Sequence, residues 1–194
     1  MSEGLSYADG GATSDPPGWT VGDVLRAAAD VSPDATAIVV RDGGRRQVWT
    51  FESLLHDAAA IARWLIDDDR TSYPIALWAP NSADVVLAQL AVALAGATLV
   101  PLNPALRPDE LVHALSVSGA AQILVAADHR GESLAAVVEA VAPDVERIVL
   151  DGTGAALLAR ASSARAGTAL PDVNPDQLAQ LQFTSGTTGP SKAV

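Results

Sequence analysis

The sequence has no cysteine among its 194 residues and a single lysine, Lys192. The first absence excludes disulfides, thiolate catalysis and cysteine-ligated metal sites, and it is consistent with a reducing, cytoplasmic compartment. Positive charge is scarce as well, with 12 Lys and Arg against 23 Asp and Glu and a net charge of -11. This acidity argues against a nucleic-acid partner or an anionic membrane surface. About half of the residues, 49%, are apolar, which is typical of a globular domain rather than a disordered chain.

One apolar run has to be weighed as a membrane span. This run, Val85 to Leu102, carries no charged residue. Gly96 stands where a helix would end, and Pro101 closes a short β-branched stretch, so the run is predicted to divide into a buried helix and a buried strand. Residues 1–18 are acidic, rich in glycine and without an apolar core. We expect them to form a disordered tail, with no secretory signal and no transmembrane segment in the chain.

The apolar pattern predicts alternating strands and helices from residue 19 onward. Helices are predicted at 21–31, 51–66, 82–95, 108–118 and 132–141, and strands at 37–41, 47–50, 74–78, 98–101, 122–126, 147–150 and 178–183. The turn Asp42-Gly43-Gly44 predicts a hairpin between the first two strands. Runs such as 123–125 and 148–150 are apolar on both faces, as in a parallel sheet covered by helices. The predicted class is therefore α/β, with a helix-covered, mostly parallel sheet in one domain over residues 19–194.

Three further features have ordinary structural explanations. The acidic run 67–69 invites a metal hypothesis, but at a helix C-terminus without another ligand in spacing it favours a solvated end. The three histidines, His56, His113 and His129, have no catalytic partner at motif spacing. Residues 152–175 are rich in Gly, Ala, Ser and Pro and are predicted to form a loop. Their start, Gly-Thr-Gly, lacks the third glycine of a dinucleotide-binding turn.

The most specific pattern is the C-terminal run Phe-Thr-Ser-Gly-Thr-Thr-Gly-Pro-Ser-Lys-Ala-Val, residues 183–194. Glycines let backbone N–H groups approach an anion, and hydroxyls add neutral donors around it. Lys192 then supplies the one ammonium of the chain beside these donors. An ordinary surface loop has the same composition, so that alternative stays open at this point. A Walker A loop is excluded, because no glycine precedes the lysine and no Ser or Thr follows it.

The run resembles the signature loop of the AMP-forming adenylating enzymes, the family of acyl-CoA synthetases, luciferase and peptide-synthetase adenylation domains. Its usual form is Tyr/Phe-Thr-Ser-Gly-Thr/Ser-Thr-Gly-x-Pro-Lys-Gly. Two positions depart from it, since Ser191 stands where proline is usual and Ala193 where glycine is usual. Other blocks of the family occur in the same order: Pro-Asp-Ala-Thr-Ala at 33–37, Trp-Thr-Phe at 49–51, Ala-Pro-Asn-Ser at 79–82, Ala-Gly-Ala at 95–97, Val-Pro-Leu-Asn-Pro at 100–104, and Pro-Asp with Leu-Ala at 175–179.

The resemblance implies two-step chemistry. A carboxylate attacks the α-phosphate of ATP to give an acyl-adenylate and pyrophosphate, with Mg2+ serving this step, and coenzyme A then takes the acyl group. Lys192 would be the catalytic residue, offsetting charge on the leaving pyrophosphate. By position in the motif, the β- and γ-phosphates would be held by Thr184, Ser185, Gly186, Thr187, Thr188, Gly189 and Lys192.

The resemblance also implies which parts of the family lie downstream of this loop: the adenine-binding loop, the ribose-binding aspartate, the magnesium-binding glutamate, the acyl pocket and the C-terminal catalytic lysine. We therefore expect residues 19–194 to be an incomplete, N-terminal part of an adenylation domain that is inactive without the rest. The expected function is an acyl-CoA synthetase acting on a fatty acid or another carboxylic acid. Thr187-Thr188 and Pro-Leu-Asn-Pro favour it over a peptide-synthetase adenylation domain. A non-catalytic nucleotide-binding or interaction module is the third alternative.

Overall fold

The structure is a computed structural model, and it describes residues 18–42, 45–165, 167–184 and 192–193. The predicted tail at 1–18 lies almost entirely outside this part, so it stays a prediction. The helices are α1 Val21–Val31, α2 Phe51–Asp67, α3 Ala83–Leu94, α4 Pro108–Ser118, α5 Leu134–Val141 and α6 Ala155–Ala161. The strands are β1 Thr36–Asp42, β2 Arg45–Thr50, β3 Ile75–Trp78, β4 Leu99–Leu102, β5 Gln122–Ala126, β6 Glu146–Leu150, β7 Phe183–Thr184 and β8 Lys192–Ala193.

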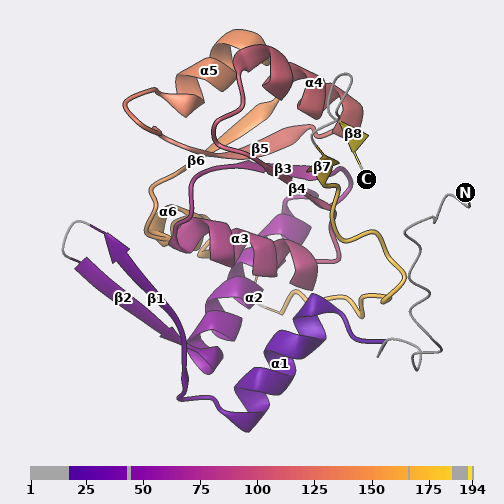
Figure 1. The fold of residues 1–194 in the computed structure, drawn as a ribbon. Coiled ribbons are helices and arrows are strands. Elements are labelled where there is room, and N and C mark those ends of the chain that lie inside the picture. The colour runs from indigo at the N-terminus through magenta and orange to yellow at the C-terminus, as the bar shows by residue number, and fades with distance from the viewer. Residues whose placement is uncertain (1–17, 43–44, 166, 185–191, 194) are drawn as a thin grey trace, which may run out of the picture.

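The centre of the fold is a four-stranded parallel sheet with the order β4-β3-β5-β6 (Figure 1). Helices α4 and α5 cover one face, and α1, α2, α3 and α6 lie on the other. Successive strand residues serve opposite faces, as the two-residue period of a strand requires. In β3, for example, Ile75 and Leu77 belong to the core on the α2–α3 side, whereas Ala76 and Trp78 belong to the core on the α4–α5 side. The predicted α/β class and the helix-covered parallel sheet are confirmed.

Local sequence explains where the helices begin and end. The Thr20 hydroxyl accepts from the Asp23 backbone N–H at 3.1 Å, and the Asp23 carboxylate accepts from the Thr20 N–H at 2.9 Å, which closes a capping box at α1. Thr50 and Ser53 form the corresponding pair at α2. Gly119 ends α4 with φ +67°, a conformation that glycine adopts without steric cost.

The predicted hairpin is present as β1 and β2, which pair antiparallel from Thr36–Thr50 to Asp42–Arg45. It projects from the α/β body in Figure 1. The Trp49 indole N–H donates to the Asp57 carboxylate at 2.9 Å, which joins the hairpin to α2. Trp49 is itself buried in the core on the α2–α3 side.

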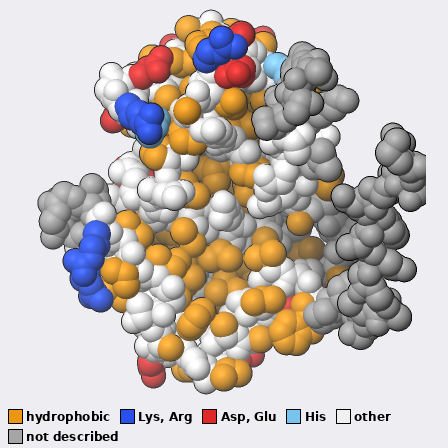
Figure 2. Space-filling view, in the orientation of Figure 1, with side chains coloured by type: hydrophobic (Ala, Val, Ile, Leu, Met, Phe, Trp, Pro, Cys, Tyr) orange, Lys and Arg blue, Asp and Glu red, His pale blue; other side chains and the backbone are white. Residues whose placement is uncertain are grey.

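The run weighed as a membrane span divides as predicted, into α3 and β4 with Gly96 between them. Gly96 has φ +66°, and no helix in the described part of the chain is long and apolar enough to cross a membrane. Helix α3 is apolar nearly all round, and such helices are normally buried. Figure 2 shows hydrophobic side chains gathered over the face that α3 and α1 present to the viewer.

Two sequence predictions were wrong in part. The stretch 152–175 is not only a loop, because α6 forms within it. Its sequence, Ala-Ala-Leu-Leu-Ala-Arg-Ala, favours a helix, but seven residues between glycine- and serine-rich flanks give a weak periodic signal. Strand β6 is not buried on both faces either, since Val149 is 42% exposed. The central strand β5 does fit that description, with Ile123, Leu124 and Val125 all fully buried.

Candidate phosphate-binding site

Residues 171–184, here named the loop-carrying segment, connect the region after α6 to the predicted phosphate-binding loop. Part of the segment runs along the free edge of β4, in the parallel direction, with a bridge between Leu99 and Gln180. The Leu99 N–H donates to the Ala179 carbonyl at 2.9 Å, and the Leu181 N–H donates back to the Leu99 carbonyl at 2.9 Å. The segment therefore extends the sheet beyond β4, although regular pairing covers less of the predicted strand 178–183 than its sequence indicated.

The segment ends in β7, which forms a two-stranded hairpin with β8. The strands pair antiparallel, with Phe183 opposite Ala193 and Thr184 opposite Lys192. Phe183 packs on the core of the α4–α5 side, and β8 contacts α4. Because the segment runs parallel to β4, the hairpin lies toward the carboxyl ends of the strands. Ligands bind at this end of the strands in open α/β sheets.

The hairpin brings together the two ends of the predicted site. Thr184 is exposed, and its backbone lies opposite that of Lys192. The other predicted phosphate ligands, Ser185, Gly186, Thr187, Thr188 and Gly189, lie outside the described residues. Of the predicted site, the structure therefore places only the two flanking residues, Thr184 and Lys192, and it sets their backbones opposite each other.

The neighbouring strand ends are held by hydrogen bonds of their own. The indole N–H of Trp78, the last residue of β3, donates to the Asn103 carbonyl at 2.8 Å, just after β4. The Asn103 side chain accepts from the Ala105 N–H at 2.9 Å, which is a local turn typical of asparagine. The family-like block Val-Pro-Leu-Asn-Pro thus forms β4 and a fixed turn after it, on the same edge strand that carries the loop-carrying segment.

One buried carboxyl group was not singled out by the sequence. Asp84, in the first turn of α3, has no exposed surface, and its Oδ2 accepts from the Gly152 N–H at 2.5 Å. Its Oδ1 has no hydrogen-bond partner among the described residues. Burial, together with the charge of Asp151, raises the Asp84 pKa to about 6, although the Gly152 N–H works in the opposite direction. Asp84 joins α3 to the turn after β6, and this points to a structural role.

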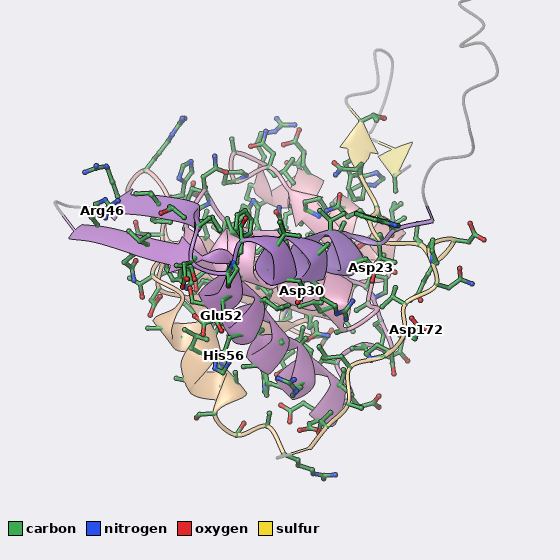
Figure 3. All side chains as sticks on the ribbon, turned by 90° about the horizontal axis from the view of Figure 1, so that it is seen from below. Asp23, Asp30, Arg46, Glu52, His56 and Asp172 are labelled. Carbon is green, nitrogen blue, oxygen red and sulfur yellow. The ribbon has the colours of Figure 1, made fainter. Side chains whose placement is uncertain are left out.

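The other polar candidates also have structural partners. In the acidic run, Asp67 accepts from the Arg165 N–H and from the Thr168 hydroxyl, and these two bonds lower the Asp67 pKa. Asp68 pairs with Arg70 at 3.3 Å. His56 is exposed on α2 (Figure 3). Within the ranges that the structure describes, no group of three His, Cys, Asp or Glu residues could hold a metal ion.

The signature-loop motif does not indicate which residues hold the loop-carrying segment on the body. The structure shows that the Gln177 amide donates to the Gly96 carbonyl and that the Thr98 hydroxyl donates to the Leu178 carbonyl at 3.0 Å. Both contacts join residues about eighty positions apart, and no local pattern marks them.

A model of the AMP-binding enzyme family matches residues 25–194, so the chain belongs to the AMP-binding enzyme family. Among curated relatives, it is 32% identical over 90% of its length to a ligase of Rhodococcus jostii, 3-[(3aS,4S,7aS)-7a-methyl-1,5-dioxo-octahydro-1H-inden-4-yl]propanoyl:CoA ligase. It is 34% identical, again over 90%, to the phosphinothricin tripeptide synthetase PhsC of Streptomyces viridochromogenes. Over 74% of its length it is 32% identical to the mouse mitochondrial medium-chain acyl-CoA ligase ACSF2. The chain spans 37%, 15% and 23% of these three proteins, respectively.

Solved structures show the same relationship. The crystal structure of VinN matches 91% of the chain with a TM-score of 0.74 and 26% identity, and the match covers 43% of VinN. The N-terminal domain of FACL13 from Mycobacterium tuberculosis matches 91% with a TM-score of 0.72 and 25% identity. The fold is thus that of adenylate-forming enzymes, and the chain corresponds to the N-terminal part of an AMP-forming ligase.

Proposed function

We propose that this chain supplies the triphosphate-binding loop of an acyl-CoA synthetase, which activates a carboxylic acid with ATP and transfers the acyl group to coenzyme A. The observation that carries the proposal is the β7–β8 hairpin, which sets Thr184 opposite Lys192 in a chain of the AMP-binding family. ATP use follows from the family. Coenzyme A as acceptor, a fatty acid or similar acid as substrate, and a cytoplasmic location are parts of the proposal.

The roles within the loop follow from the charge of the reaction. We assign binding of the β- and γ-phosphates to four hydroxyls and to the backbone around two glycines: Thr184, Ser185, Thr187 and Thr188, with Gly186 and Gly189. Lys192 offsets the negative charge that grows on pyrophosphate as the bond to the α-phosphate breaks. A charge fixed where negative charge develops lowers the barrier more than it tightens ground-state binding.

Magnesium, when bound, neutralises phosphate charge and orients the triphosphate. The described residues offer no cluster of acidic side chains for it, so we propose no magnesium ligand among them. The contacts to adenine, ribose and acyl group are likewise left to other parts of a complete enzyme. Because the chain spans less than two fifths of the relatives above, we expect these 194 residues alone to form no hydroxamate from ATP, hydroxylamine and carboxylic acids.

A second candidate is a peptide-synthetase-type adenylation domain, in which a carrier-protein thiol replaces coenzyme A. The similarity to the synthetase PhsC supports it, at an identity that matches the acyl-CoA ligases. The acceptor separates the two, since only a coenzyme A ligase would release acyl-CoA when a complete enzyme with this region is given both thiols. A non-catalytic nucleotide-binding module would bind ATP yet form no acyl-adenylate in that complete enzyme.

The test of the loop's role is a calorimetric titration of the 194-residue chain with pyrophosphate. We expect Lys192→Ala to weaken binding about tenfold or more, because an ionic contact to phosphate is lost. Arg46→Ala is the matched control, since it removes one positive charge from an exposed position. Figure 3 shows Arg46 on the β1–β2 hairpin, on the other side of the molecule from β7 and β8. Equal affinities for wild type and Lys192→Ala would refute the role of Lys192, and absence of binding by the wild type would refute the loop as a phosphate site.

A further inference from the structure

Among the described residues, the hydrogen bonds that attach the loop-carrying segment to the body reach the turn between α3 and β4 and the first residue of β4. Four residues of the segment take part: Gln177 through its side chain, Leu178 and Ala179 through their carbonyl groups, and Leu181 through its N–H. Their partners are the Gly96 carbonyl, the Thr98 hydroxyl, and the N–H and carbonyl of Leu99. We name these seven residues the clamp.

Near Leu178, packing adds little to the hydrogen bonds of the clamp, whereas Leu181 and Phe183 further along the segment pack on the core of the α4–α5 side. Leu178 is 54% exposed, and the residues around it in the segment are exposed as well. Beneath the segment, between it, α1 and the end of α3, lies a cavity of about 150 Å³ lined mainly by apolar side chains, among them Val21, Ala93 and Val173. Figures 1 and 3 show the segment on the α1 side of the molecule, with Asp172 marked on it in Figure 3. Since a cavity provides few close contacts, the hydrogen bonds of the clamp hold the part of the segment around Leu178 in place.

The chemistry of the clamp is specific for a donor at position 177. Gly96 follows the last turn of α3, so its carbonyl lies at the negative end of the helix dipole. The Gln177 amide donates to that carbonyl. A carboxylate at the same position would have the same size, but it could not donate and would face like charge.

We propose that Gln177 is a positioning residue for the phosphate-binding loop. By holding the segment against the α3–β4 turn, Gln177 sets the position along β4 at which β7 begins. It thereby sets where Thr184 and Lys192 stand relative to the strand ends. The inference rests on the proposed function, because it assigns Gln177 a part in phosphate binding through the position of the predicted loop.

The experiment compares three variants of the 194-residue chain in two measurements. Gln177→Glu keeps the side-chain size and removes the donor, and Gln177→Ala removes the side chain. Gln180→Glu is the control, because it makes the same charge change at an exposed residue of the same segment. Among the described residues, the Gln180 amide group bonds only Gln182. Pyrophosphate affinity is measured by calorimetry. Amide exchange of Leu99, whose N–H bonds the segment, is measured by NMR.

We expect Gln177→Glu to weaken pyrophosphate binding about three- to tenfold and to speed exchange of the Leu99 amide, with a smaller effect from Gln177→Ala. Gln180→Glu should leave both quantities within about twofold of the wild type, and the melting temperatures of all variants should agree, since both side chains are exposed. Wild-type affinity in Gln177→Glu would overturn the inference while leaving the proposed function intact. Equal losses in Gln177→Glu and Gln180→Glu would also overturn it, because charge alone would then explain them. A wild type that binds no pyrophosphate would instead overturn the proposed function, and the inference with it.

Discussion

The central sheet and the loop-carrying segment use different physical means to stay in place. Leu124 in β5 is 1% exposed and packs in the core on the α2–α3 side, whereas Leu178 in the segment is 54% exposed and lines a cavity. The sheet is stabilised by buried apolar area, whereas the segment around Leu178 is held by a few hydrogen bonds to the α3–β4 turn and to Leu99. The comparison teaches that the residues that build the core and the residues that hold the segment before the predicted phosphate-binding loop are largely separate sets.

The largest expected effect tests this separation with one substitution at two leucines. Leu124→Ala should lower the free energy of unfolding by about 2–5 kcal/mol, because it opens a cavity in a fully packed core. Leu178→Ala should change it by no more than about 0.5 kcal/mol, as for other surface positions. Urea unfolding followed by circular dichroism measures both. Similar losses at the two positions would show that the segment is part of the core.

The second prediction concerns Asp84, whose pKa is raised from 3.8 to about 6 in the folded protein. A raised carboxyl pKa means that the folded state binds the proton more tightly than the unfolded state. This contribution is therefore full below about pH 3.8 and is lost as the pH rises through 6. At about 1.4 kcal/mol for each pKa unit, the loss is at most about 3 kcal/mol.

Asp84→Asn provides the comparison, since the amide oxygen can still accept from Gly152 and the side chain does not titrate. The difference in unfolding free energy between the variant and the wild type should shift in favour of Asp84→Asn between pH 4 and pH 7. A difference that is constant over this range would contradict the assigned pKa. The absolute level of Asp84→Asn is not the test, because its buried N–H groups bring their own cost.

Sequence patterns predicted most of the sheet region and much less of the segment. The apolar periods of residues 75–78 and 122–126, and glycines such as Gly96 and Gly119, mark elements through local rules of strand and helix formation. The bonds of Asp84 to Gly152 and of Gln177 to Gly96 join residues 68 and 81 positions apart. No local rule specifies such pairs, so the clamp and the buried carboxyl group could be found only in the folded arrangement.

The smallest expected effect is a difference in hydrogen exchange at the clamp. The Leu99 amide bonds the loop-carrying segment, whereas the Leu124 amide lies in the central strand β5, which is paired on both sides. We expect the protection factor of Leu99 to be about tenfold or more below that of Leu124, because detaching the segment leaves the sheet intact. Equal protection of the two amides would mean that segment and sheet open together.

The central claim, that residues 184–192 bind the phosphates of ATP, is tested most directly by amide exchange across 185–191, read by mass spectrometry with and without ATP and Mg2+. We predict that exchange there slows on addition of ATP and Mg2+ in the wild type and slows much less in Lys192→Ala, while exchange in β5 stays unchanged in both. Exchange across 185–191 that is the same with and without ATP and Mg2+ in the wild type would contradict the claim.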